Sequence, residues 1–172
     1  MKYVALLRGI NVGGVTVKMA DLKKEFDKLG FKEVKTLLAS GNVVFNAPKK
    51  DARKLQKKIE EALEKKYKRS IRVLVLPITD IEKLAKSDPF KGIEVTKDTR
   101  LYVTFFNSPA KTHLKSINEY FRVVKTSPLA VCSVLVISPD RCSIDLMDAV
   151  GKHYGKDVTT RNWNTVQKIL KA

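Results

Sequence analysis

Three separate segments of the chain carry polar side chains of the types that bind anions. The first, Arg8–Gly14, is a glycine-containing loop between a short apolar run and a stretch with helical spacing. Backbone N–H groups and the positive end of a helix dipole can hold a phosphate or a carboxylate at such a place. Ser40–Asn42 and Thr160–Asn164 add hydroxyl, amide and guanidinium donors. The candidate ligand-binding residues are Arg8, Asn11, Gly13, Gly14, Ser40, Gly41, Asn42, Arg161, Asn162 and Asn164.

The first two segments also have a purely structural interpretation. Gly13 and Gly14 permit the positive φ angles of a turn, and Ser40 and Asn42 are ordinary residues of a hairpin. The loop Arg8–Gly14 fits neither the dinucleotide-binding pattern nor the P-loop pattern. Sequence spacing therefore leaves both interpretations open.

Arg161 stands just before a predicted C-terminal helix, which Thr160 or Asn162 can cap. A cation at a helix N-terminus opposes the helix dipole, at a cost of up to about 1 kcal/mol. We therefore expect Arg161 to meet either an internal acid, such as Asp157 or Asp145, or a bound anion.

A run of basic residues on a predicted amphipathic helix suggests a second candidate function. Lys49–Lys58 contains six basic residues and one acid, Asp51. This excess is typical of a surface that contacts nucleic-acid phosphates, although a solvated helix face gives the same pattern. The candidate nucleic-acid contacts are Lys50, Arg53, Lys54, Lys57 and Lys58.

The overall charge agrees with an anionic partner. The 172 residues include 34 Lys and Arg against 18 Asp and Glu, a net charge of +16. Such a charge attracts nucleic acid, acidic lipid and phosphorylated small molecules. Because no apolar run is long enough to span a bilayer, we expect a small anionic ligand or nucleic acid, and no membrane. The oligomeric state stays open, and a scaffold whose motifs are only structural is a third interpretation.

No pattern of a catalytic or metal centre stands in the sequence. GxSxG and HExxH are absent, and Ser40 has no base assigned to it, so enzymatic activity stays open. The two cysteines and two histidines lack metal-ligand spacing, and we expect no metal and no cofactor. The start MKYVALLRG lacks the apolar length of a signal peptide, which predicts a cytoplasmic location.

The order of apolar runs predicts an α+β fold. Strand candidates at 2–7, 34–39, 42–45 and 71–76 alternate with helices at about 22–29 and 51–67. This is the βαββαβ order of a ferredoxin-like half over residues 1–77. Residues 78–172 predict a second, degenerate α+β half that packs with the first as one compact unit. Its expected elements are strands at 101–106, 121–125, 129–138 and 142–144, and helices at 80–86, 111–119, 146–153 and 163–170.

In the ferredoxin-like order the first two strands point the same way. The loop Arg8–Gly14 and the turn Ser40–Asn42 should therefore meet at one end of the sheet. We expect a polar pocket there, completed by the helix start Thr160–Asn164. The RNA-recognition module shares this order, with Tyr3 and Phe45 on its central strands, but residues 42–45 lack most aromatics of its RNP pattern.

Three motifs occur in order along the chain: YVALLRGINVGG at 3–14, ASGNVVF at 39–45 and TTRNWNTV at 159–166. Together they strongly resemble the bacterial and archaeal family catalogued as domain of unknown function 1697. That family has no established activity, so the resemblance implies a fold and a shared site but no reaction. The stretch Arg141–Asp145 departs from the Ser-Lys stretch of family members.

Overall fold

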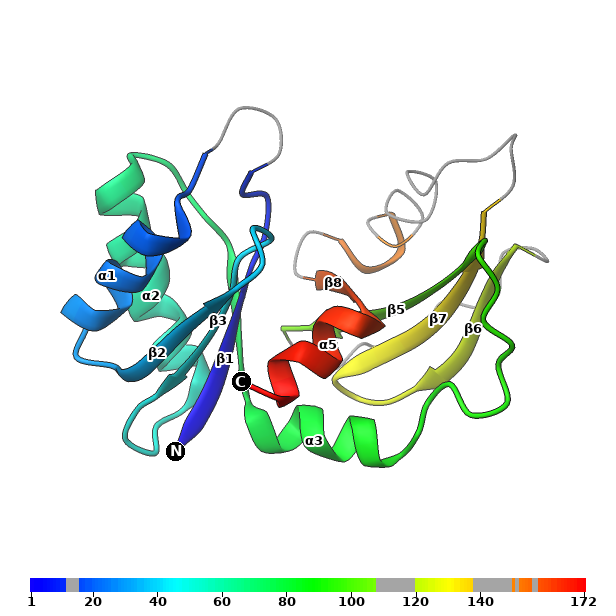
Figure 1. Ribbon diagram of the computed structural model, residues 1–172. Coiled ribbons are helices and arrows are strands. Elements are labelled where there is room, and N and C mark those ends of the chain that lie inside the picture. Colours follow the sequence, from blue (N-terminus) through cyan, green and yellow to red (C-terminus); the bar gives the residue numbers. More distant parts are fainter. Residues whose placement is uncertain (12–15, 108–119, 138–149, 151, 156–157) are drawn as a thin grey trace. The chain divides into compact units, whose positions relative to one another are not determined.

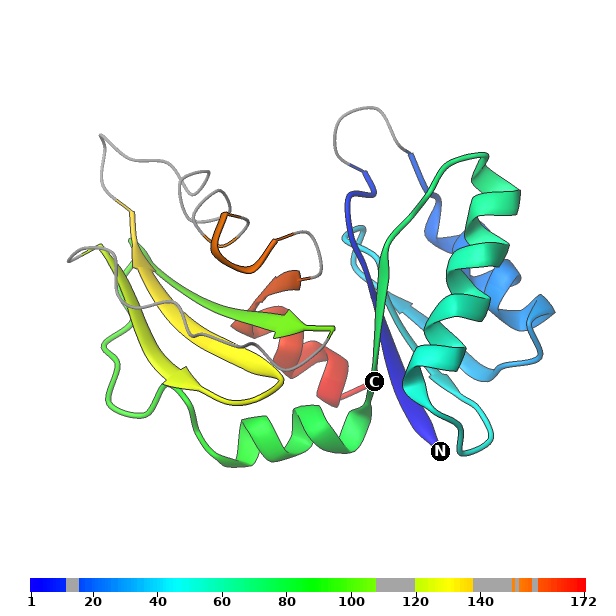
Figure 2. The ribbon, with the colours of Figure 1, turned by 180° about the vertical axis from the view of Figure 1, so that it is seen from behind.

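The computed structural model describes residues 1–11, 16–107, 120–137, 150, 152–155 and 158–172. The chain divides into two compact units (Figure 1, Figure 2). The first comprises Met1–Lys83 together with Lys168–Ala172, and the second comprises Leu84–Gln167. Each unit has its own four-stranded sheet, and the fold is α+β, as the sequence predicts.

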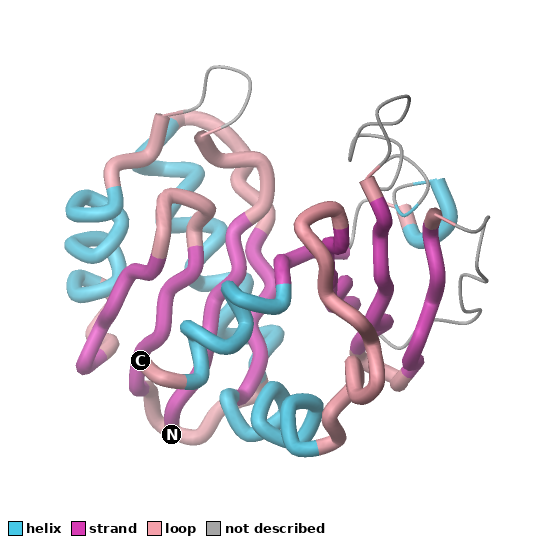
Figure 3. The backbone as a smooth tube through the Cα atoms, turned by 45° about the vertical axis from the view of Figure 1, so that its right-hand side comes forward, coloured by secondary structure: helices cyan, strands magenta, loops and turns pink. Residues whose placement is uncertain are grey.

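The first unit has the element order that the sequence predicts. Its strands lie in the order β2-β3-β1-β4, with every pair of neighbours antiparallel. Figure 3 shows the strands of this unit side by side as a sheet. This is the ferredoxin-like arrangement, in which β1 and β2 point the same way with β3 between them. The elements are β1 (Lys2–Leu7), α1 (Met19–Lys28), β2 (Lys32–Leu37), β3 (Asn42–Asn46), α2 (Ala52–Tyr67) and β4 (Val73–Pro77), followed by α3 (Ile78–Lys86).

One face of the first sheet packs against α1 and α2, which Figure 2 shows side by side. Tyr3, Ala5 and Leu7 of β1 point to this face because side chains alternate along a strand. The helices contribute apolar stripes at helical spacing, and full burial of each such side chain stabilises the fold by about 1.5–3 kcal/mol. The buried apolar residues of the two helices are Leu22, Phe26, Leu55, Ile59 and Leu63.

Local signals in the sequence set the ends of these two helices. Gly30 has a φ of +82°. Its N–H donates to the carbonyl of Asp27 at 2.9 Å, and the N–H of Phe31 donates to the carbonyl of Phe26 at 3.4 Å. These two hydrogen bonds form the Schellman motif that ends α1. The carboxylate of Asp51 accepts the N–H of Arg53 at 2.9 Å and caps the start of α2.

The opposite face of the first sheet is buried as well. Val4, Leu6 and Val44 are at most 1% exposed, as expected for central strands that are apolar on both faces. Lys35 of β2 lies opposite Val44 in the register and so shares this face, and its ammonium donates to a backbone oxygen of Ala172. The C-terminal residues therefore contact the first sheet.

The second unit repeats the strand order of the first. Its sheet has the order β6-β7-β5-β8, again with antiparallel neighbours. The second half is thus more regular than the degenerate arrangement expected from the sequence. The elements are β5 (Thr99–Phe106), β6 (Phe121–Thr126), β7 (Ala130–Val136), β8 (Val158–Asn162) and α5 (Trp163–Leu170).

Helix α5 begins at Trp163, as predicted, but the segment directly before it forms strand β8, which the sequence analysis did not expect. The segment pairs with β5, and Arg161 lies opposite Val103. Only Val158 of its five residues is apolar, so the hydrophobic pattern carries no strand signal there. The helix expected at 111–119 and the strand expected at 142–144 lie outside the described residues, as does most of the helix expected at 146–153.

Candidate functional site

The loop after β1 and the turn between β2 and β3 contact each other, as the predicted topology requires. The N–H of Leu7 donates to the carbonyl of Gly41 at 2.8 Å, and the amide of Asn11 donates to the carbonyl of Ala39 at 2.6 Å. We call the residues Arg8–Asn11 together with Ala39–Asn42 the loop junction. Gly13 and Gly14 lie outside the described residues.

The amide of Asn11 holds the loop junction together. Its Oδ1 accepts the N–H of Val17 at 2.7 Å, and its Nδ2 donates to the carbonyl of Val17 at 3.2 Å as well as to Ala39. Asn11 has a φ of +56°, which asparagine tolerates better than most residues. These contacts give Asn11 a structural role that the sequence left undecided.

Asn42 and Gly41 also have structural roles. Asn42 is 0% exposed, and its Nδ2 donates to the carbonyl of Leu37 at 2.9 Å and to the hydroxyl of Ser40 at 3.0 Å. Gly41 has a φ of +71°, and a Cβ there would lie 2.5 Å from Cδ1 of Ile10. The turn needs glycine because the two segments approach so closely.

The turn is longer than the predicted two-residue hairpin. Strand β2 ends at Leu37, so four residues separate it from β3, and Leu38 has a φ of +57°. Arg8, beside this turn, is half-buried, and its backbone N–H donates to the carbonyl of Arg72 at 2.9 Å. The ligand role of Arg8 and of its neighbours stays a prediction.

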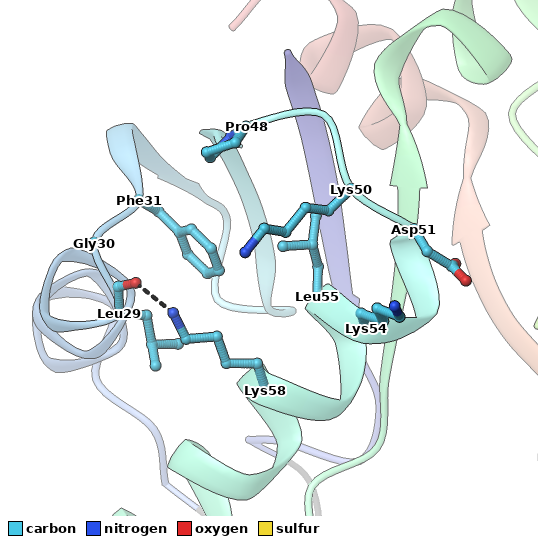
Figure 4. A pocket seen from close by; sticks show the side chains of 9 residues that line it. All are labelled: Leu29, Gly30, Phe31, Pro48, Lys50, Asp51, Lys54, Leu55 and Lys58. Carbon is cyan, nitrogen blue, oxygen red and sulfur yellow. Dashed lines mark hydrogen bonds between the residues drawn. The ribbon is translucent and has the colours of Figure 1, made fainter.

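A pocket lies at the end of the first sheet that is opposite to the loop junction. In the register of β1 and β3, Leu6 pairs with Asn42 at the end of the loop junction, and Lys2 pairs with Asn46 at the end of the pocket. The hollow measures about 470 Å³ and is drawn in Figure 4. It is formed where the end of α1 meets the start of α2. We call it the lysine pocket, and it is lined by Leu29, Gly30, Phe31, Pro48, Lys50, Asp51, Lys54, Leu55 and Lys58.

Three lysines give the pocket its positive charge. The ammonium of Lys58 donates to the carbonyl of Leu29 at 2.8 Å and lies 5.5 Å from the ring centroid of Phe31, a cation–π contact. Among the described residues, neither Lys50 nor Lys54 forms an ion pair. Figure 4 shows the ammonium groups of Lys50 and Lys58 pointing toward Phe31.

The first turn of α2 carries positive charge, which is unfavourable at a helix N-terminus. It contains no acid, although Arg53 and Lys54 stand there. Cations at this end oppose the helix dipole, whereas Asp or Glu would be favourable by about 0.3–1 kcal/mol each. The capping carboxylate of Asp51 points away from the hollow in Figure 4. The lysine pocket therefore adjoins a helix start that carries unbalanced positive charge in its first turn.

The structure divides the predicted nucleic-acid contacts into two groups. Lys50, Lys54 and Lys58 line the pocket. Lys57 lies outside it and forms an exposed ion pair of 3.9 Å with Glu61, and Arg53 is exposed and does not line it either. The apolar wall of the pocket was missed by sequence reasoning, because no local pattern tells which helix ends meet. The one usable signal was Gly30, which marks the end of α1.

Arg161 lies in the second unit, on β8, just before helix α5. Its guanidinium donates to the carbonyl of Thr160 at 2.9 Å, and burial lowers the pKa of Arg161 to about 10. Asn162 caps α5 by accepting the N–H of Asn164 at 2.9 Å, and Asn164 is exposed. Arg161 directly precedes Asn162, the cap of α5, so it still stands next to a helix N-terminus, and the partner expected for it stays a prediction. Asp145 and Asp157, the predicted internal partners, lie outside the described residues.

Comparisons with known proteins place the chain in a family. The profile described as "Protein of unknown function (DUF1697)" matches residues 1–126. The chain belongs to the DUF1697 family. The match covers the loop junction and the lysine pocket, whereas the motif at 159–166 lies beyond it.

The fold of this DUF1697 protein is also that of a solved structure. A conserved bacterial protein from Streptococcus pneumoniae superposes with a TM-score of 0.67 at 21% identity, covering 99% of this chain and 97% of that chain. At this identity the likeness shows the fold alone. No curated protein matches the chain significantly.

The DUF1697 sheet does not present the aromatic platform of an RNA-recognition module. Tyr3 and Phe45 stack with ring centroids 5.8 Å apart, but both are at most 1% exposed and belong to the core under α1 and α2. Bases cannot stack on rings that the helices cover. The structure thus agrees with the weak RNP pattern in the sequence.

Other chemistries find little support in the described part of the chain. It contains no group of three or more His, Cys, Asp or Glu side chains placed to hold a metal. None of its helices is long and apolar enough to cross a bilayer. Cys132 is buried, and burial raises the pKa of its thiol to about 12, against a smaller opposing effect of Lys125. A thiol with this pKa is a poor nucleophile at neutral pH.

Proposed function

We propose that this protein binds a small anionic ligand, bearing phosphate or carboxylate groups, in the lysine pocket. One observation carries the proposal: Lys50, Lys54 and Lys58 line a single hollow of about 470 Å³ at the start of α2. This volume is within the range of about 300–1,000 Å³ that is common for small-ligand sites. The site differs from the pocket expected at the loop junction, where Asn11 and Asn42 already hydrogen-bond within the protein.

The charges around the hollow favour an anion over a neutral ligand. Lys50 and Lys54 form no ion pair within the described residues, so an incoming anion does not have to displace an internal carboxylate. Each hydrogen bond to a charged group contributes about 1.5–3 kcal/mol at best. Because the lysines are exposed, salt screens part of this attraction.

Thermal unfolding with and without pyrophosphate tests the proposal, since a ligand that binds only the folded state raises the melting temperature. We expect a rise for the unaltered protein and for Lys57→Ala, and a much smaller rise for Lys50→Ala and Lys54→Ala. Lys57→Ala is the matched control, because it removes the same charge from the same helix outside the pocket. No rise in the unaltered protein, or equal loss in all three variants, would contradict the proposal. Arg8→Ala in the same series tests the loop junction.

Nucleic-acid binding through α2 is the second candidate. It is favoured by the exposure of Lys50, Arg53, Lys54 and Lys57 on one helix start with a single nearby acid. Binding of duplex DNA should then weaken with salt, with a slope of log K against log[salt] of roughly −0.9 per phosphate contacted. Here Lys57→Ala should weaken binding as much as Lys54→Ala does, which separates this function from the pocket.

A further inference from the structure

The lysine pocket is larger than one simple anion requires. At roughly 30 Å³ per water molecule, the hollow of about 470 Å³ corresponds to about sixteen waters. A single inorganic phosphate would fill a small part of it. A ligand that fills the pocket therefore has a substantial body in addition to its anionic group.

The wall of the pocket indicates the nature of that body. Four of the lining residues, Leu29, Phe31, Pro48 and Leu55, carry no charge. The ring of Phe31 is held by the core, with its centroid 4.5 Å from that of Phe45. Phe31 is only 7% exposed, so it presents a fixed, limited aromatic surface to the hollow.

The cations are arranged unequally along the pocket. Lys58 is already engaged by the carbonyl of Leu29 and by the Phe31 ring. Lys54 stands one turn closer to the start of α2, a rise of about 6 Å along the helix, and Lys50 precedes the helix. Figure 4 shows Lys54 apart from Phe31, whereas the ammonium groups of Lys50 and Lys58 point toward the ring. The anionic group of a ligand is therefore best placed near Lys54, with its uncharged body toward Phe31.

We infer that the ligand is a phosphorylated molecule with a planar ring, of the nucleoside monophosphate or diphosphate class. This inference rests on the proposed function and adds the ring to it. Contact between aromatic rings contributes about 0.5–1.5 kcal/mol. The ring should thus strengthen binding by about two- to tenfold over a ring-free phosphate of equal charge.

The experiment compares pairs of ligands that differ only in the ring. Titration calorimetry on the unaltered protein measures AMP against ribose 5-phosphate, and phenyl phosphate against methyl phosphate. We expect the ring-bearing member of each pair to bind about two- to tenfold more tightly, and Lys54→Ala to weaken all four. Phe31→Leu should remove the preference, so that the two members of each pair bind this variant with similar affinity. Circular dichroism first shows that this variant is folded, and if it is not, the ligand pairs decide alone.

The outcomes distinguish the two proposals. Equal affinities within each pair, together with loss of binding in Lys54→Ala, would overturn the ring inference and leave the anion pocket standing. No binding of any of the four compounds, and none of pyrophosphate, would overturn both.

Discussion

The side-chain amide of Asn11 reaches the carbonyl oxygen of Ala39 at 2.6 Å, across 28 positions of sequence. The same amide also bridges to both backbone groups of Val17. One side chain therefore joins the loop after β1, the approach to α1 and the turn between β2 and β3. Both N–H bonds of this amide are used within the protein, which leaves no donor for a ligand unless a contact breaks.

Asn11→Ala should destabilise the protein by about 2–3 kcal/mol. Three hydrogen bonds are lost, each contributing about 0.5–1.5 kcal/mol, and alanine adopts the φ of +56° less readily. Urea unfolding measures the change, and Asn11→Gly separates the hydrogen bonds from the backbone effect. A loss below about 0.5 kcal/mol would mean that the amide has little structural role.

Gly41→Ala should cost more stability than Gly30→Ala. Both glycines have a positive φ, but only at Gly41 would a Cβ meet other atoms, 2.5 Å from Cδ1 of Ile10 and 2.8 Å from Cβ of Leu7. The backbone cost of about 1 kcal/mol is common to both, so the difference between the two variants measures the steric overlap. Equal losses of unfolding free energy in the two variants would show that the loop junction accommodates the added Cβ at no cost in stability.

The first unit was predictable because its signals are local. The glycine at position 30, the cap at Asp51 and the apolar spacing of Leu55, Ile59 and Leu63 each depend on neighbours in sequence. The contact between the two loops followed from strand order alone. Strand β8 was not predictable, since Arg161 and its polar neighbours owe their strand to pairing with β5.

The site was harder to predict than the fold. The sequence predicts the lysines near Asp51 as a nucleic-acid contact or a solvated helix face, and not as part of a pocket. That three of them share a hollow with Phe31 depends on where α1 ends relative to α2, which is a tertiary relationship. The amides of Asn11 and Asn42 were predicted as ligand contacts, but they hydrogen-bond within the protein. The sequence does not separate these two roles, because both use the same polar side chains.

The thiol of Cys132 should resist modification in the folded protein. Burial raises its pKa to about 12 from an ordinary value of 9.0, and the thiolate is the reactive form. In a Cys142→Ser background, which leaves Cys132 alone, we expect iodoacetamide labelling at pH 8 only after unfolding. Rapid labelling of the native protein would show that the strand β7 opens readily.

The same shift predicts how stability depends on alkaline pH. Because the folded state holds the thiol proton more tightly than the unfolded state, its contribution is fully present below about pH 9 and is lost between about pH 9 and 12. Unfolding in urea at several pH values measures this loss. Cys132→Ala should lose less unfolding free energy over this pH range than the unaltered protein. If the variant loses as much, the alkaline loss of stability comes from other groups.

Lys54→Glu should change stability and ligand binding in opposite directions. Lys54 is the third residue of α2 after the Asp51 cap, so a glutamate there completes a capping box and suits the helix dipole. We expect the free energy of unfolding to rise by about 0.5–1 kcal/mol at neutral pH, with the gain shrinking in salt and below about pH 4, where the carboxylate is protonated. Pyrophosphate binding should fall at least tenfold, because a negative charge replaces a positive one in the pocket. If Lys54 is only a solvated surface residue, the free energy of unfolding will rise while pyrophosphate binding stays unchanged. A lower free energy of unfolding in Lys54→Glu would show that the helix dipole does not disfavour cations in the first turn of α2.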